Sequence, residues 1–186
     1  CHMAEATSMN LAEQAAERAL ASICNCIEQR KSFLLEAGAG AGKTYSLIKT
    51  LGYLIDKQGI DLLRRNQQIA CITYTNVATD EIKSRTDRHP AILSSTIHAF
   101  CWSLIKDFQP VLREKILQLS EWPEKIAEAG GIDTRKVDYE LGYRKVDEEH
   151  IFLSHNDVLS LTVALMECNK FRKLFAARYP MLLIDE

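Results

Sequence analysis

The sequence lacks the features that mark several large classes of protein. It has no run of about 18 apolar residues, so a membrane-spanning helix is not expected, and no charged segment followed by an apolar one at its start, so a secretory signal peptide is not expected. Its six cysteines form no C-x-x-C pair and no zinc-type cluster with histidine, which favours reduced thiols in a cytoplasmic protein. A formal net charge of −2 gives no general attraction to nucleic acid, so such a partner must be argued from local features.

What the 186 residues do contain is a composition typical of one packed domain, or one domain with a modest insertion, since 47% are hydrophobic. Residues 1–8, which begin Cys1-His2-Met3, are expected to be a cloning remnant or a disordered tail.

Strand-type and helix-type segments alternate along most of the chain. Helices are predicted over residues 10–29, 42–59, 76–88, 97–107, 156–168 and 171–179, the second ending at Gly59. Strands are predicted over residues 32–37, 67–75, 91–97 and 181–186. This order predicts an α/β fold in which a parallel sheet has helices on both faces.

The pattern changes over residues 110–155, which are expected to form a mostly helical insertion between the two parts of the main domain, 9–109 and 156–186. A helix is predicted up to Ala129 with a break at Trp122-Pro123, followed by a β-ribbon around Gly142, because apolar and polar residues alternate there. Asn156 is the expected cap of the next helix.

One stretch of small residues carries the strongest chemical signal. Between a predicted strand and a predicted helix the chain reads Ala37-Gly38-Ala39-Gly40-Ala41-Gly42-Lys43-Thr44, followed by Tyr45. It fits the phosphate loop G-x-x-x-x-G-K-[ST], with alanine in place of the first glycine. Small side chains let backbone N–H groups surround phosphate oxygens at a helix N-terminus. The stretch predicts a nucleoside triphosphate site, with Lys43 on the β- and γ-phosphates and the Thr44 hydroxyl on Mg²⁺.

The last predicted strand ends in two acids, Asp185 and Glu186. Beside a phosphate loop, Asp185 is predicted to bind Mg²⁺, and Glu186 to orient and deprotonate the attacking water. The alternative is a solvated pair of acids. The pair favours hydrolysis over kinase chemistry, because a kinase needs no water-activating acid.

Several segments together resemble the first motor domain of UvrD/Rep-type superfamily 1 DNA helicases. In order, the segments that carry the resemblance are MNLAEQ (9–14), EAGAGAGKT (36–44), ITYTN (72–76) with Ala78, Glu81 and Arg85, STIHAFC (95–101) and LLIDE (182–186). They are similar to the family's glutamine segment, phosphate loop, TFTNxAAxEMxxR and TxHxFC segments, and the start of its DExQD motif. Order and spacing agree over residues 9–107 and 156–186.

The resemblance implies a RecA-like ATP-binding domain and a role for each of these segments. Gln14 would read the adenine of ATP, whose edge an amide can match. The residues implied to contact single-stranded DNA are Tyr74, Thr75, Asn76, Thr96 and His98. The Tyr74 ring would stack on a base for about 1–3 kcal/mol. A buried, hydrogen-bonded core histidine is an equal alternative for His98, and Val77 stands where the family often has a lysine.

The resemblance also implies partners beyond these residues. The family's arginine fingers and second RecA-like domain follow the Asp-Glu motif, so this segment is expected to be nearly inactive by itself, within a protein that moves 3′ to 5′ on DNA and serves a nuclease, repair or defence partner. The strand that should separate the phosphate-loop strand from 181–186 also follows, so a gap or an unpaired sheet edge is expected. Two alternatives stay open: another P-loop enzyme, such as an ATPase switch or a kinase, or a non-catalytic module that binds ATP or a partner.

Overall fold

The structure is a computed structural model that describes residues 11–36, 42–132 and 135–185. Its helices are α1 (Leu11–Glu28), α2 (Lys43–Arg64), α3 (Asn76–Arg85), α4 (Ile97–Ile105), α5 (Gln109–Ile116), α6 (Trp122–Glu128), α7 (His155–Met166) and α8 (Asn169–Arg178). Its strands are β1 (Ile69–Thr73), β2 (Ile92–Thr96), β3 (Lys136–Gly142), β4 (Lys145–Val146), β5 (His150–Ser154) and β6 (Met181–Asp185).

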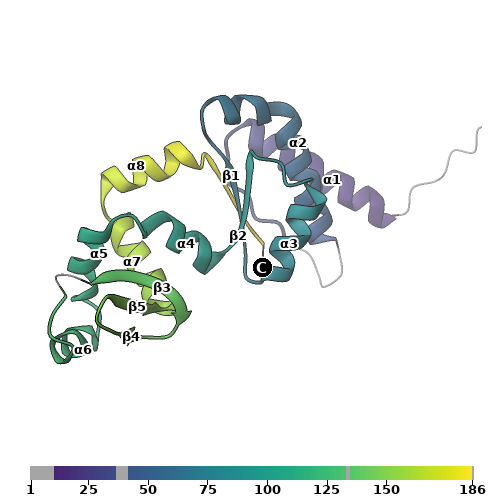
Figure 1. The fold of residues 1–186 in the computed structure, drawn as a ribbon. Helices are drawn as coiled ribbons and strands as arrows, with labels where there is room; N and C mark the ends of the chain where they lie inside the picture. The colour runs from purple at the N-terminus through teal and green to yellow at the C-terminus, as the bar shows by residue number, and fades with distance from the viewer. Residues whose placement is uncertain (1–10, 37–41, 133–134, 186) are drawn as a thin grey trace, which may run out of the picture.

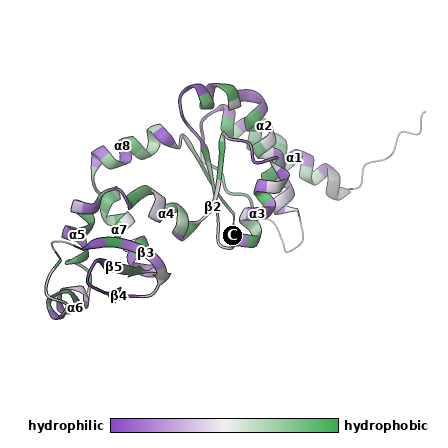
Figure 2. Ribbon diagram, in the orientation of Figure 1, coloured by the Kyte–Doolittle hydropathy of each residue, from purple (hydrophilic) through white to green (hydrophobic). Residues whose placement is uncertain are grey.

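The elements form two lobes (Figure 1). The main lobe holds α1, α2, α3 and the sheet β2-β1-β6; the second lobe holds α5, α6, α7 and the sheet β3-β5-β4, and α4 and α8 link the two. Hydrophobic residues line both α4 and α7, which pack against each other at the junction (Figure 2). Over the described ranges, no helix has the length and apolar character needed to cross a membrane.

The main sheet is parallel, as predicted, and β1 lies at its centre. Alternate side chains of β1 enter two different cores. Ile69 and Cys71 pack in a cluster with residues of α2 and α3, whereas Ala70 and Ile72 pack with Phe100 of α4 and with partly buried aromatic residues of α8. Helices therefore cover both faces of the sheet, which confirms the predicted fold class.

One predicted strand, residues 32–37, is wrong over its described part: residues 31–36 belong to no helix or strand. A strand needs a hydrogen-bonded neighbour, and among the described residues β6 pairs with β1 alone, so residues 31–36 form no ladder with the sheet. Leu182 and Ile184 of β6 are 43% and 58% exposed, and Leu34 is 82% exposed. The unpaired edge expected from the sequence is therefore present, and it is apolar.

The predicted stop of the second helix at Gly59 is wrong, because α2 continues to Arg64. Gly59 is buried within the helix, and a Cβ there would lie 3.4 Å from His89 Cε1. The glycine allows close packing against His89 instead of ending the helix, and the buried Leu62 beyond it ties the last turn to the core.

The second lobe differs from the expected mostly helical insertion by containing a three-stranded sheet. Its helices α5 and α6 are separated at residues 117–121, and the predicted break at Trp122-Pro123 is in fact the start of α6, whose first turn accepts proline. The predicted ribbon around Gly142 is also wrong: β3 and β4 do not pair with each other, because β5 lies between them, parallel to β3 and antiparallel to β4.

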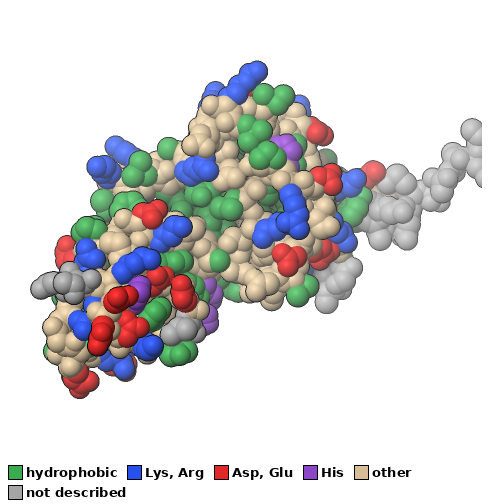
Figure 3. Space-filling view, in the orientation of Figure 1, with side chains coloured by type: hydrophobic (Ala, Val, Ile, Leu, Met, Phe, Trp, Pro, Cys, Tyr) green, Lys and Arg blue, Asp and Glu red, His purple; other side chains and the backbone are tan. Residues whose placement is uncertain are grey.

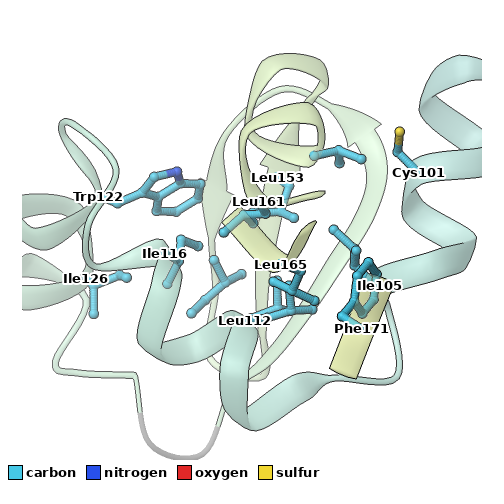
Figure 4. Close-up of a cluster of buried hydrophobic side chains, with 13 residues drawn as sticks. Cys101, Ile105, Leu112, Ile116, Trp122, Ile126, Leu153, Leu161, Leu165 and Phe171 are labelled. Carbon is cyan, nitrogen blue, oxygen red and sulfur yellow. The ribbon is translucent and has the colours of Figure 1, made fainter. Parts of the chain in front are cut away.

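A buried cluster fills the space between this second sheet and the helices of its lobe (Figure 4). The fully buried Trp122 lies at one end of the cluster, and Phe171 of α8 lies toward the other. The expected cap at Asn156 is wrong, because Ser154 caps α7 in a reciprocal capping box with Asp157. The cap lies two residues earlier since the Ser-x-x-Asp spacing satisfies two backbone N–H groups at once.

Candidate functional site

The predicted site residues gather at the carboxyl end of the main sheet. Thr73 of β1 is in register with Thr96 of β2 on one side and with Asp185 of β6 on the other. The segment that follows β1 therefore leaves the sheet beside Asp185, and the segment that follows β2 leaves at the same end of the sheet, on the other side of β1. Ligands of open parallel sheets bind at this end of the strands.

The N-terminus of α2 is suited to an anion. Gly42 precedes the helix with φ 79° and ψ 26°, in the left-handed region that glycine adopts without strain. Within the described part of the chain no side chain caps this end, and its first turn carries no acid. Lys43 and Thr44 open the helix, so a positive charge joins the positive end of the helix dipole. The other loop residues predicted to bind nucleotide, 37–41, lie outside the described residues, as does Glu186.

Asp185 lies within the electrostatic reach of Lys43. Burial raises the pKa of Asp185, the charge of Lys43 opposes that rise, and the charge of Glu81 on α3 adds to it. Burial of Cys71, and to a smaller extent the charge of Asp185, raise the pKa of Cys71 to about 12. The structure thus brings together the two groups that the sequence assigned to phosphate and Mg²⁺.

Glu81 interacts electrostatically with Asp185, although sequence patterns assign it no role at the predicted Mg²⁺ site. It lies on α3 and forms an ion pair with Arg85, at 3.0 Å between Oε1 and Nη2. Its position in the segment that follows ITYTN was visible in the sequence. Its electrostatic interaction with Asp185 was not, because that depends on how α3 packs against β1 and β2.

The turn from β1 into α3 presents one aromatic ring to solvent and buries one hydroxyl. Tyr74 is 62% exposed, whereas Thr73 is 1% exposed. The Thr73 hydroxyl donates to the carbonyl of Thr75 at 3.0 Å and lies 2.7 Å from the Thr79 hydroxyl. Thr75 caps α3 by accepting from the Ala78 N–H at 3.2 Å, and Asn76 is the first residue of the helix.

In the turn from β2 into α4, as in the turn from β1 into α3, a threonine caps the helix. Thr96 ends the strand and caps the helix, accepting from the Ala99 N–H at 3.4 Å. His98, half-buried, packs its ring against His155 of α7, with 4.9 Å between centroids and 47° between planes. Burial and the nearby His155 both lower the pKa of His98. His155 itself was missed, because residues 57 positions apart meet only when α4 and α7 pack together.

Gln14 is half-buried near the start of α1 and lines a shallow hollow with Glu17, Arg18 and Ala21 of the same helix. The far end of α1 is tied to α2, where the Tyr53 hydroxyl donates to Glu28 Oε1 at 2.6 Å. Tyr45, on the first turn of α2, is 53% exposed, and Lys49 lies over its ring at 5.5 Å from the centroid.

Comparison with known proteins gives matches over the same region. Residues 17–121 match the family described as UvrD/REP helicase N-terminal domain. The chain is 39% identical over 132 residues to the Gabija protein GajB of Bacillus cereus, a stretch that covers 71% of this chain and 18% of that protein. It is 32% identical over 102 residues to a probable DNA helicase II homolog of Mycoplasma capricolum, covering 52% of this chain and 13% of that protein.

A shorter match links the chain to the ATP-dependent DNA helicase PcrA of Staphylococcus aureus, at 33% identity over 78 residues, which are 39% of this chain and 10% of that protein. The chain therefore spans less than a fifth of the length of each of these relatives.

Proposed function

Because this chain belongs to the UvrD/REP helicase N-terminal domain family, we propose that it is the part of an ATP-dependent DNA motor that binds ATP-Mg²⁺ and single-stranded DNA. The observation that carries the proposal is the meeting of Lys43, Asp185 and the turns after β1 and β2 at one end of one sheet. We assign residues 9–109 and 156–186 to the RecA-like ATP-binding domain and residues 110–155 to an insertion in it, with α7 packed into the core of the second lobe.

The α2 N-terminus fits the triphosphate of ATP. Gly42 has a backbone conformation that a larger side chain would strain, and the helix start beside it combines backbone N–H groups with the Lys43 ammonium. The loop residues 37–41 would complete the cradle, and Gln14 would read the adenine. When bound, ATP-Mg²⁺ supplies the phosphoanhydride bond and the divalent charge that the reaction needs.

Thr44 and Asp185 are the protein oxygens that would hold Mg²⁺. Across the described ranges no cluster of three His, Cys, Asp or Glu side chains could hold a metal. That fits Mg²⁺, which is commonly bound by one or two carboxylates together with substrate phosphates and water. Burial and the charge of Glu81 disfavour the charged form of Asp185, and a bound cation would favour it, as the Lys43 charge does. Glu186 would orient and deprotonate the attacking water.

The turns after β1 and β2 suit single-stranded nucleic acid. Tyr74 exposes a ring on which a base can stack. Thr75 and Thr96 use their hydroxyl oxygens as helix caps, which leaves each hydroxyl proton free to donate to a phosphate oxygen. Asn76 and His98, in the first turns of α3 and α4, would add amide and imidazole donors near the positive helix ends.

In the longer protein we propose that ATP hydrolysis drives 3′-to-5′ movement on DNA, with a second RecA-like domain supplying the groups that stabilise transition-state charge. A nuclease, repair or defence partner remains part of the proposal. The main alternative is a P-loop ATPase that does not use DNA. The exposed Tyr74 and the paired turns favour the DNA motor, because a switch or kinase needs neither.

The test is DNA-stimulated ATPase activity of the full-length protein that contains this chain. Lys43→Ala should abolish the stimulated activity, whereas Lys57→Ala, an exposed lysine farther along the same helix, should leave it within about twofold of the parent. An ATPase that single-stranded DNA does not stimulate would favour the switch, and an active Lys43→Ala protein would contradict the proposed site.

A further inference from the structure

The two lobes are joined at the predicted nucleic-acid turn by a pair of histidines. Strand β2 runs directly into α4 at Thr96, and β5 runs directly into α7 at Ser154, each last strand residue serving as the helix cap. Because α4 and α7 pack against each other, the rings of His98 and His155 meet near the starts of these helices. Their centroids are 4.9 Å apart. In Figure 3, histidine side chains reach the surface where the lobes join.

The His155 ring is fixed from the second lobe. Its Nδ1 is hydrogen-bonded to the hydroxyl of Tyr139 on β3, whose ring lies 5.6 Å from it at 70°. A Cβ added at Gly142 would lie 2.8 Å from both Cε1 and Nε2 of His155, so a larger residue there would require the His155 ring to shift. Gly142 also has φ 72°, where other residues are strained. Tyr139, Gly142 and His98 thus confine the His155 ring.

The Tyr139 hydroxyl determines how the His155 ring presents its nitrogens. When the hydroxyl donates to Nδ1, a neutral His155 carries its own proton on Nε2. Such a hydrogen bond would limit rotation of the His155 ring, which contacts the ring of His98. Tyr139 is further braced by Trp102 on α4, at 6.1 Å between ring centroids.

We propose that Tyr139 and His155 are positioning residues that hold His98 in the orientation in which its N–H meets a nucleic-acid phosphate. This inference rests on the proposed function of the β2–α4 turn and adds a role for the second lobe: it sets the contact that the main lobe makes. The competing possibility is that Tyr139 and His155 touch nucleic acid themselves.

The test uses Tyr139→Phe, which removes one oxygen atom and keeps the ring. Tyr143→Phe is the matched control, because Tyr143 lies just after β3 and is 59% exposed. Affinity for a fluorescein-labelled oligothymidylate is measured by anisotropy for both variants, for His98→Ala and for the double variant Tyr139→Phe/His98→Ala. The ring resonances of ¹⁵N-labelled histidine are recorded for each chain without DNA.

Tyr139→Phe is expected to weaken binding about two- to tenfold, the range for one lost hydrogen bond, while Tyr143→Phe has no effect. In the His98→Ala background, Tyr139→Phe should cause no further loss. The His98 ring resonances should shift in Tyr139→Phe and stay in place in Tyr143→Phe. If Tyr139→Phe does not fold, His155→Gln carries the same comparison.

Two results would overturn the inference and leave the proposed function intact. The first is that the His98 resonances do not move in Tyr139→Phe. The second is that the losses of affinity from Tyr139→Phe and His98→Ala add fully in the double variant, which would show that Tyr139 contacts nucleic acid directly. A parent chain whose oligothymidylate affinity is unchanged by His98→Ala overturns the proposed role of the turn instead. In that case a resonance shift in Tyr139→Phe still supports the positioning of His98 by Tyr139.

Discussion

Thr73 and Asp185 face each other in register at the carboxyl ends of the neighbouring strands β1 and β6. Asp185 lies beside the charge of Lys43, and the Thr73 hydroxyl contacts the Thr79 hydroxyl on α3. Tyr74, the exposed ring proposed to stack on a base, is the residue after Thr73. The proposed Mg²⁺ ligand therefore lies opposite Thr73, and the proposed base-stacking ring is the residue that follows Thr73 in the chain. A buried hydrogen bond joins Thr73 to α3.

That hydrogen bond is expected to stabilise the fold measurably. Thr79 is 4% exposed, and Thr79→Val keeps its shape while removing the hydroxyl that lies 2.7 Å from Thr73 Oγ1. The free energy of unfolding should fall by about 0.5–1.5 kcal/mol, since one buried hydrogen bond is lost while the Thr73 hydroxyl keeps its bond to the Thr75 carbonyl. Urea denaturation measures it, with the exposed Ser84→Ala on the same helix as control. Equal stability of the two variants would contradict this.

Asp157 should make the stability of the chain depend on acid pH. Burial by itself would raise the pKa of Asp157, but hydrogen bonds from Arg144 and Ser154 outweigh it and hold the pKa below its ordinary value. Arg144 binds it through Nη2 to Oδ1 at 2.6 Å and through Nε to Oδ2 at 2.9 Å. A lowered folded pKa stabilises the protein above the unfolded pKa of about 3.9, and this stabilisation is lost as pH falls through the folded value.

The parent chain should therefore lose more stability between pH 6 and pH 3 than Asp157→Asn, as measured by urea denaturation at each pH. Arg144→Met at pH 7 should cost about 2–4 kcal/mol, because it leaves a carboxylate that is 2% exposed without its main partner. Identical pH profiles for the parent and Asp157→Asn would contradict the argument.

Asp185→Asn should separate Mg²⁺ binding from phosphate binding. The substitution keeps the shape of the side chain and removes the charge that would hold Mg²⁺. We expect the enhancement of ATP-analogue binding by Mg²⁺ to fall severalfold, while binding without Mg²⁺ is unchanged or stronger, because one negative charge near the phosphates is gone. Titration with and without Mg²⁺ measures both. Asp80→Asn, 77% exposed on α3, is the control and should behave as the parent.

Among the described residues β6 has an open edge, which should make the chain associate at high concentration. Unpaired apolar edges pair with other chains, and Ile184 is 58% exposed there. Ile184→Lys should lower the associated fraction seen by sedimentation velocity, whereas Ile60→Lys, which replaces a residue 69% exposed on α2, should not. If both lysine variants reduce association equally, general apolar exposure and not the edge is responsible.

Local patterns in the sequence predicted the parts of the fold that depend on local rules. The apolar strand ending in Asp185 and the amphipathic α2 could be predicted because hydrophobic periodicity is local, whereas most of the predicted phosphate loop, residues 37–41, lies outside the described residues. The strand expected at 32–37 failed because a strand also depends on a neighbour. Gly59 failed as a stop because glycine serves equally in close helix packing, here against His89.

Contacts between segments that are distant in the sequence could not be predicted from local sequence patterns. The approach of His155 to His98 and of Glu81 to Asp185 each requires two elements to pack, and neither has a spacing signature. The cap at Ser154 does have one, since Ser-x-x-Asp precedes an apolar helix, and the expectation of a cap at Asn156 is wrong.

The measurement that tests the central claim most directly is the binding of a fluorescent ATP analogue with Mg²⁺ to this chain. If the α2 N-terminus holds the triphosphate, Lys43→Ala should weaken binding by roughly tenfold to a hundredfold, the range for a lost charge-assisted hydrogen bond, while Lys57→Ala binds as the parent does. Equal affinity of the Lys43→Ala and Lys57→Ala chains would contradict the account.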